Sequence, residues 1–298
     1  MQQHMLKIRV LGLALGTGLI ASTSGWAGSS TSAPSACARA SAASIPARSA
    51  KAPGGTAVMA GVEGLRGKER DAVLERQLLA GNIPPFLRDL VPVNFSGQFG
   101  GKTVRITICV MPDYLSVGTN RDFVRTPLGL PTAAQVALRL GFLLPTPKMV
   151  DAIYAQARIR LSPQPMPAGD EMTSTGYLMR HNETVDAQLG SAAGTPDELI
   201  AGQKKDVVMT NRLREFPGKV AIYGWHRGAG DPIQPLSTVH QAVYADYSHG
   251  IRLVSAIALV NGQLEPLAEV MQDPTLSTLI SREGPIEDAE GLMATVSQ

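Results

Sequence analysis

Hydrophobic and polar positions recur along the chain at spacings that predict both helices and strands. The apolar residues of Leu65–Ala80 have helical spacing with charges on the opposite face, and Pro84-Pro85 ends this helix. Thr103–Val110 alternates and is rich in β-branched residues, which predicts a strand. The loop Pro112–Pro131 follows, and its polar residues are placed to line a cleft or simply to form turns.

The second part of the chain continues these patterns with more strands. The spacing between Pro167 and Gln188 is ambiguous. The other predicted elements are helices at Thr132–Leu140, Pro147–Arg158, Pro196–Lys204, Leu267–Gln272 and Thr275–Ser281, and strands at Asp206–Thr210, Lys219–Trp225 and within Ile251–Val260. Helices come mainly in the N-terminal half and strands in the C-terminal half. This order predicts an α+β fold with a mixed or antiparallel sheet in the C-terminal half.

The N-terminal region lacks such periodicity and is predicted to lie outside the folded domain. Basic residues precede the apolar run Val10–Ala21, and a small-residue pattern ends at Ala27, which is typical of a signal peptide over residues 1–27. The Ser/Ala/Pro-rich residues 28–57 predict a disordered linker. We therefore expect an exported protein, periplasmic or secreted, with one globular domain at residues 58–298 and no transmembrane segment in the mature chain.

Composition changes this picture in two respects. The net charge is only +2, so the chain has no strongly basic field and we do not expect a nucleic-acid partner. The two cysteines are Cys37 and Cys109, and export permits a disulfide between them. Cys37, however, lies in the low-complexity segment. The apolar strand around Cys109 favours a buried, inert thiol, and the pairing stays open.

Candidate chemistry concentrates in Gly224–Val254. Three of the five histidines of the chain, His226, His240 and His249, lie in this stretch together with Asp246. Neutral imidazole is a common metal ligand, and a His/Asp set with one open position suits catalytic zinc. The tentative metal ligands are therefore His226, His240, Asp246 and His249. No H-E-x-x-H and no paired C-x-x-C is present, so the spacing permits zinc without identifying it.

A second interpretation needs no metal. A histidine would act as general base, an Asp would orient it, and a Ser or Tyr would supply the nucleophile or proton. The candidate catalytic residues are His240, Asp246, His249 and Tyr247. Aromatic rings beside acids and imidazoles commonly line sites for sugars or peptides. The candidate binding residues are Trp225, Tyr244, Arg227, Arg252 and Lys204.

Ordinary structural roles stay open for all of these residues: a half-buried His, a core aromatic ring or a surface ion pair would leave the same pattern. For His181 we expect a loop or surface position.

Four segments of the chain also carry a resemblance. PDYLSVGTNRDFVRTP, LPTPKMVDAIY, KKDVVMTNRL and YADYSHGIRLV, spread over most of Lys102–Ile286, resemble segments of a family of exported bacterial proteins. The resemblance implies no reaction and no catalytic residues. Export of the protein is the one property that it supports.

Two functions are consistent with these observations. The first is an exported hydrolase that acts through the His/Asp site, metal-dependent or by acid–base catalysis, on a peptide-like or glycan-like polymer of the envelope or the medium. The alternative is a non-catalytic envelope module that binds glycan or peptide through a Tyr/Trp surface. Imidazole is scarce elsewhere in the chain, and a binding module has no need to gather it, so the enzyme is favoured.

Overall fold

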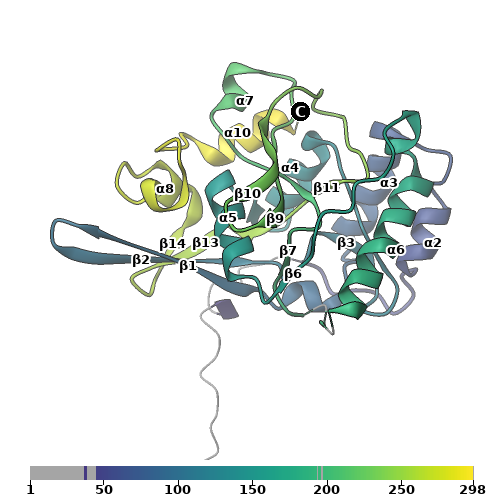
Figure 1. The fold of residues 1–298 in the computed structure, drawn as a ribbon, viewed down its shortest axis with the longest axis horizontal. Helices are drawn as coiled ribbons and strands as arrows, with labels where there is room; N and C mark the ends of the chain where they lie inside the picture. Colours follow the sequence, from purple (N-terminus) through teal and green to yellow (C-terminus); the bar gives the residue numbers. More distant parts are fainter. Residues whose placement is uncertain (1–36, 39–44, 193, 196, 298) are drawn as a thin grey trace, which may run out of the picture. The chain divides into compact units, whose positions relative to one another are not determined.

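Two larger β-sheets and the helices around them form the part of the chain that the computed structural model describes (Figure 1). This part comprises residues 37–38, 45–192, 194–195 and 197–297, and it belongs to one compact unit, residues 34–298. The predicted signal peptide and the first part of the predicted linker lie outside the described residues. The α+β class is confirmed, with helices mostly in the N-terminal half and sheet mostly in the C-terminal half.

The first sheet is antiparallel and contains the longest hairpin. Its strand order is β14-β13-β2-β12-β5, and β1 pairs along the whole of β2, from Val91 opposite Val110 to Phe99 opposite Lys102. Gly100 and Gly101 both have positive φ at the hairpin tip, as the tight two-residue turn requires. The strands are β1 (Val91–Phe99), β2 (Lys102–Val110), β5 (Phe142–Leu143), β12 (Val254–Ser255), β13 (Ile257–Val260) and β14 (Gln263–Pro266).

The second sheet is mixed, as predicted for the C-terminal half, and carries the candidate site. Its order is β10-β9-β8-β11, in which β11 runs parallel to β8 and the other pairs are antiparallel. The strands are β8 (Lys205–Val207), β9 (Ile222–Gly228), β10 (Asp231–Ser237) and β11 (His249–Gly250). Two small pairs, β3 (Ser116–Gly118) with β4 (Phe123–Arg125) and β6 (Ile159–Arg160) with β7 (Ile200–Ala201), stand apart.

Helices flank these sheets, and Figure 1 shows α2, α3 and α6 gathered at the end of the molecule away from the β1–β2 hairpin. The helices are α2 (Gly55–Ala60), α3 (Gly67–Leu79), α4 (Leu130–Arg139), α5 (Pro147–Gln156), α6 (Thr175–Ser191), α7 (Arg212–Glu215), α8 (Leu267–Gln272), α9 (Ser277–Ile280) and α10 (Ala289–Val296). Short 3-10 turns lie at Pro85–Arg88 and Asp170–Thr173. One main apolar cluster joins both halves, since Leu74 and Ile106 share it with Val254.

Most of the predicted elements are present and one is wrong, whereas several elements, among them β1, β10 and α10, were not predicted. The predicted helix at Pro196–Lys204 is wrong: Ile200 and Ala201 are buried and form β7, parallel to β6. Glu198, one of the two acidic residues at the start of the predicted helix, instead accepts hydrogen bonds from Thr195 and Arg158. The loop expected at Pro112–Pro131 contains the short strands β3 and β4.

Most of the segment between Pro167 and Gln188, whose spacing was ambiguous, forms part of helix α6. Ser174 caps its N-terminus by accepting a hydrogen bond from the backbone N–H of Tyr177, 3.2 Å away. Its buried face contains His181 and Asn182 as well as apolar residues. These polar residues interrupt the apolar stripe by which a helix is recognised in a sequence.

The segment before Val58 packs on the domain, so the predicted linker ends earlier than residue 57. The Arg48 guanidinium donates hydrogen bonds to the side chain of Asn82 and the carbonyl of Gly118, both at 2.9 Å. The backbone N–H of Gly55, at the start of α2, donates to the carbonyl of Asp122 at 2.9 Å. Ser/Ala/Pro composition indicated disorder because these contacts use mainly backbone groups and one arginine, with few apolar side chains such as Ile45 packed on the core.

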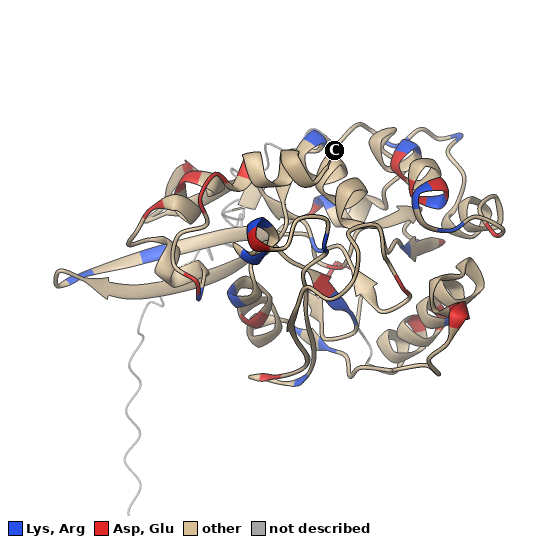
Figure 2. Ribbon diagram, turned by 90° about the horizontal axis from the view of Figure 1, so that it is seen from above, with Lys and Arg blue, Asp and Glu red and all other residues tan. Residues whose placement is uncertain are grey.

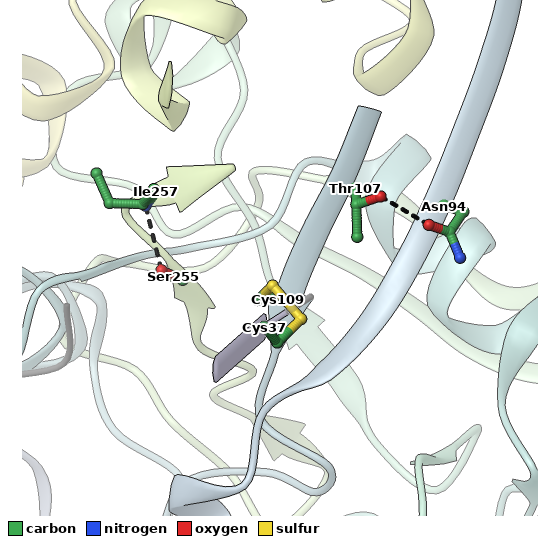
Figure 3. The surroundings of a disulfide bond; sticks show 6 residues. All are labelled: Cys37, Asn94, Thr107, Cys109, Ser255 and Ile257. Carbon is green, nitrogen blue, oxygen red and sulfur yellow. Dashed lines mark hydrogen bonds between the residues drawn. A yellow bond between two sulfur atoms is a disulfide. The ribbon is translucent and has the colours of Figure 1, made fainter. Parts of the chain in front are cut away.

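Cys37 and Cys109 form a disulfide across 72 residues of sequence, beside the Asn94–Thr107 hydrogen bond of the β1–β2 hairpin (Figure 3). Cys109 is buried in β2, as its apolar surroundings predicted. The expectation of an inert free thiol is wrong, because both cysteines are paired. The bond ties the start of the described chain to the first sheet.

Helix α5 gives a prediction about stability. Thr146 caps it: the side-chain oxygen accepts a hydrogen bond from the backbone N–H of Met149 at 3.2 Å and donates one to the carbonyl of Ile280. We expect Thr146→Ala to lower the free energy of unfolding by about 1 kcal/mol in urea titrations, the usual effect of losing such a cap. Thr146→Ser keeps the hydroxyl and should lose clearly less. Equal losses in both variants would assign the effect to the methyl group.

Candidate functional site

A tight turn places His249 at the edge of the second sheet. The backbone N–H of His249 donates to the carbonyl of Asp246 at 3.1 Å, and Asp246 Oδ1 accepts hydrogen bonds from the backbone and hydroxyl of Ser248 at 2.8 and 2.6 Å. The carboxylate thereby closes an Asx-type turn. After this turn, His249 pairs with Lys205 of β8. The next residue is Gly250. A Cβ at this position would lie only 2.5 Å from the ring of Tyr114, so a larger residue would clash with that ring.

Four of the predicted site residues come together here. The rings of His240 and Tyr244 stack with their centroids 4.3 Å apart. The His249 ring lies 5.7 Å from that of Tyr244 and 6.4 Å from that of His240. The Tyr244 hydroxyl donates to Asp246 Oδ2 at 3.1 Å. Two imidazoles, a phenol and a carboxylate thus form one cluster, which we call the His240–His249 cluster.

This cluster lies at the wall of a groove of about 460 Å³. The groove is lined by Gly67, Thr173, Val239, His240, Gln241, Val243, Tyr244 and Ala245. His240 and Tyr244 are half-buried, whereas Asp246 is 2% and His249 0% exposed. The cluster therefore extends from the groove into the protein, with His249 as its innermost ring.

Burial controls the protonation of His249. It lowers the pKa of His249 to about 4; the nearby Asp246 carboxylate opposes this shift, and Lys205 and His240 add to it. Both ring nitrogens of His249 lack a hydrogen-bond partner among the described residues. For Asp246, burial alone would raise the pKa, but His249 and the hydrogen bonds from Ser248 outweigh burial and lower it. At neutral pH a neutral imidazole thus lies beside a carboxylate.

Lys204, predicted as a binding residue at a strand entrance, is 1% exposed and lies behind the cluster. Its ammonium group donates to the carbonyl of Tyr247 at 2.5 Å and lies 3.0 Å from Nδ1 of His181. Burial lowers the pKa of Lys204 to about 7. The surface position expected for His181 is wrong: its ring is buried on α6, and burial followed by the nearby Lys204 lowers its pKa to about 2.

The predicted Tyr/Trp binding surface is not formed. The Tyr247 hydroxyl exchanges hydrogen bonds with the backbone of Met166, at 2.7 and 3.2 Å, which also removes Tyr247 from the catalytic candidates. Trp225 is 5% exposed, packs on Tyr247 and lies beneath the Lys205 ammonium group. Its φ of +56° is unusual for a bulky residue. Of the expected aromatic residues, Tyr244 alone lines the groove.

The two predicted arginines have structural partners. Arg227 forms an ion pair with Asp231 at 3.1 Å, and both side chains are exposed. Arg252 is fully buried, donates to the carbonyls of Met111 and Ile200 at 2.9 and 2.6 Å, and covers the ring of Tyr114. Neither pairs with Asp246, so their prediction as binding residues is not supported by these contacts.

His226 belongs to a different cluster, which corrects the tentative metal set. Adjacent strand residues point to opposite faces of a sheet, so Trp225 packs toward Tyr247 while His226 packs on the other side of β9. There the His226 ring stacks on Tyr154 at 4.7 Å, and its Nε2 lies 2.9 Å from Asp151 Oδ1. Within the described ranges, no group of three or more His, Cys, Asp or Glu side chains is placed to hold a metal ion.

Arg125 and Asp113 belong to the polar loop after β2, whose polar residues were expected to line a cleft or to form turns. They form an ion pair at 2.7 Å, with both side chains at most 1% exposed. Asp206, in contrast, was not among the candidate residues. Asp206 accepts a hydrogen bond from Tyr114 at 3.0 Å, and burial raises its pKa to about 6. It lies in a strand pattern that gives no hint of a special carboxyl group.

The chain matches no protein-family model, no curated protein and no solved structure. In the portion that the structure describes, none of the helices has the length and apolar character needed to cross a membrane.

Proposed function

We propose that the chain is an exported hydrolase in which His249 is the general base and His240 works with it on the substrate side. The observation that carries this proposal is a buried imidazole with two unpartnered ring nitrogens, next to a second imidazole that lines a groove. Buried polar groups in proteins nearly always have hydrogen-bond partners, so an orphaned ring calls for a ligand or a reacting water.

The spacing of the rings fits a water-mediated reaction. The centroids of His240 and His249 lie 6.4 Å apart, and the proposal places one water molecule between the two rings. His249 takes a proton from that water as its oxygen attacks the carbonyl or anomeric carbon of the substrate. His240, at the groove, enters the step protonated and donates its proton to the departing nitrogen or oxygen. The proton left on His249 is then released to solvent, and His240 is protonated again before the next turnover. Asp246 holds the turn that carries His249, and its negative charge stabilises the imidazolium as it forms.

The groove favours a segment of a peptide-like or glycan-like polymer. Its volume of about 460 Å³ lies within the range of small-molecule sites, and its lining combines the rings of His240 and Tyr244 with the amide of Gln241. Basic and acidic positions are interspersed along the described elements (Figure 2), which gives no support for a nucleic acid. The disulfide is compatible with an envelope or extracellular location.

Two hydrolysis assays on the mature protein test the proposal. New amino ends released from an unstructured protein and new reducing ends released from β-linked oligosaccharides are measured with wild type and His240→Gln. We expect one of the two products from wild type, and a rate at least about tenfold lower in the variant. Because His226 lies apart from the other three tentative ligands, and no three such side chains of the described residues are placed to hold one metal ion, a chelator should leave the rate unchanged. The proposal fails if wild type releases neither product, or if His240→Gln is as active as wild type.

The acid side of the pH profile gives a further prediction. A general base works only when deprotonated, and the pKa of His249 is lowered to about 4. We therefore expect kcat/KM to fall as the pH drops through about 4 and to be level from there to pH 6. A decline that begins near pH 6.5, the ordinary value for histidine, would mean that an exposed imidazole is the base.

A further inference from the structure

A second cavity, of about 470 Å³, lies on the other side of the chain segment that carries His240. Ala242 lines this cavity, whereas its neighbours Gln241 and Val243 line the groove. The segment is fixed between them, since the backbone of Ala242 donates to Gly218 at 2.8 Å and accepts from Leu130 at 2.7 Å. The cavity is therefore separate from the groove.

The wall of the cavity is apolar along one part. Leu213 of α7, and Leu292 and Val296 of α10, contribute aliphatic side chains, and two prolines and Ala242 add to them. Such a wall excludes water and favours a hydrocarbon ligand at roughly 25 cal/mol per Å² of apolar surface that it covers.

Three basic side chains, Lys68, Arg214 and Lys219, also line the cavity, and no acidic residue is among the described lining residues. None of the three forms an ion pair within the part of the chain that the structure describes. Arg214 and Lys219 donate to backbone carbonyls, which fix their positions without neutralising their charges. A ligand of this cavity is therefore expected to carry a negative charge.

One large apolar side chain is exposed next to the cavity wall in the sequence. Phe216 is among the exposed large hydrophobic side chains of the described residues, and it directly precedes the lining residue Pro217. Exposed Val239 and Val243, in contrast, line the groove on the other side of the segment. The apolar character of the cavity therefore comes from its own wall.

We propose that this cavity binds a free single-chain fatty acid, with its carboxylate among Lys68, Arg214 and Lys219 and its alkyl chain against Leu292 and Val296. Charge and apolar surface select this class: the basic side chains favour an anion, and the apolar part of the wall favours an alkyl chain. The proposal is independent of the hydrolase activity, because the His240–His249 cluster lies on the groove side of the segment.

Calorimetric titration of the mature protein with monomeric dodecanoate tests this proposal. Dodecyl maltoside below its micellar concentration serves as the neutral ligand of equal chain length. We expect dodecanoate to bind at least about tenfold more tightly, as charge-assisted hydrogen bonds to the carboxylate predict. Equal affinities, no binding of dodecanoate, or binding only to phosphatidylglycerol vesicles would each overturn the proposal.

Two variants locate the ligand. Thr295 is exposed on α10 at the cavity wall, so Thr295→Trp should block the chain and abolish binding, whereas Thr295→Ser should bind like wild type. Lys68→Gln should weaken binding of dodecanoate several-fold and leave the neutral ligand unaffected, and Lys102→Gln at the hairpin tip is its matched control. Unchanged binding in both Thr295→Trp and Lys68→Gln, with the melting temperatures preserved, would place the ligand elsewhere.

Discussion

His249→Gln should lower kcat/KM for hydrolysis by about 10²–10⁴-fold, the usual contribution of a general base. Glutamine has a similar size and its amide can hydrogen-bond, but it cannot accept a proton from water. The measurement is the rate of product release at pH 7 under substrate-limited conditions. Thermal unfolding of the same sample establishes that the variant is folded.

The chain offers a matched control in His226→Gln. His226 is also buried and also lies beside a carboxylate, Asp151, but on the opposite side of β9. We expect this variant to lose stability, since Asp151 loses one of its partners, and to keep most of its activity. Comparable losses of activity in both variants would show that burial of histidine, rather than membership of the His240–His249 cluster, is what matters.

Removal of the disulfide should lower the free energy of unfolding by about 4 kcal/mol, because the bond restricts a loop of 72 residues in the unfolded chain. The variant is Cys37→Ala combined with Cys109→Ala, which leaves no free thiol, and urea unfolding measures the effect. A reducing agent should destabilise wild type by a similar amount and should leave the double variant unchanged. A loss below about 1 kcal/mol would contradict this expectation, and it would mean that the folded state without the bond gains nearly as much freedom as the unfolded chain does.

Periodicity predicted the α+β class and those elements whose apolar side chains show one clear period. Thr103–Val110 and Leu267–Gln272 each show one clear period, and both form the expected element. Helix α6 could not be recognised, since its buried face holds His181 and Asn182. The disulfide was equally hidden: a low-complexity segment says nothing of a single residue in it that is held by a covalent bond.

The sequence identified some members of the candidate site but not its geometry. Clustering of His240, Asp246 and His249 in the sequence reflected a real cluster in space, because a short loop and one turn connect them. His226 was assigned to the same place, since sequence distance does not reveal that β9 turns its side chain away. The positions of Tyr247 and Trp225 depend on packing against residues far along the chain, which no local pattern contains.

The most direct test of the His240–His249 cluster is a double-mutant cycle on kcat/KM with His240→Gln, His249→Gln and the combination. If both rings act on one water molecule, removal of the first already disables the step that the second serves, and the effects are not additive. The double variant should then be no slower than His249→Gln alone, within about threefold. Losses that multiply in full would show that the two histidines act independently and would contradict a shared site.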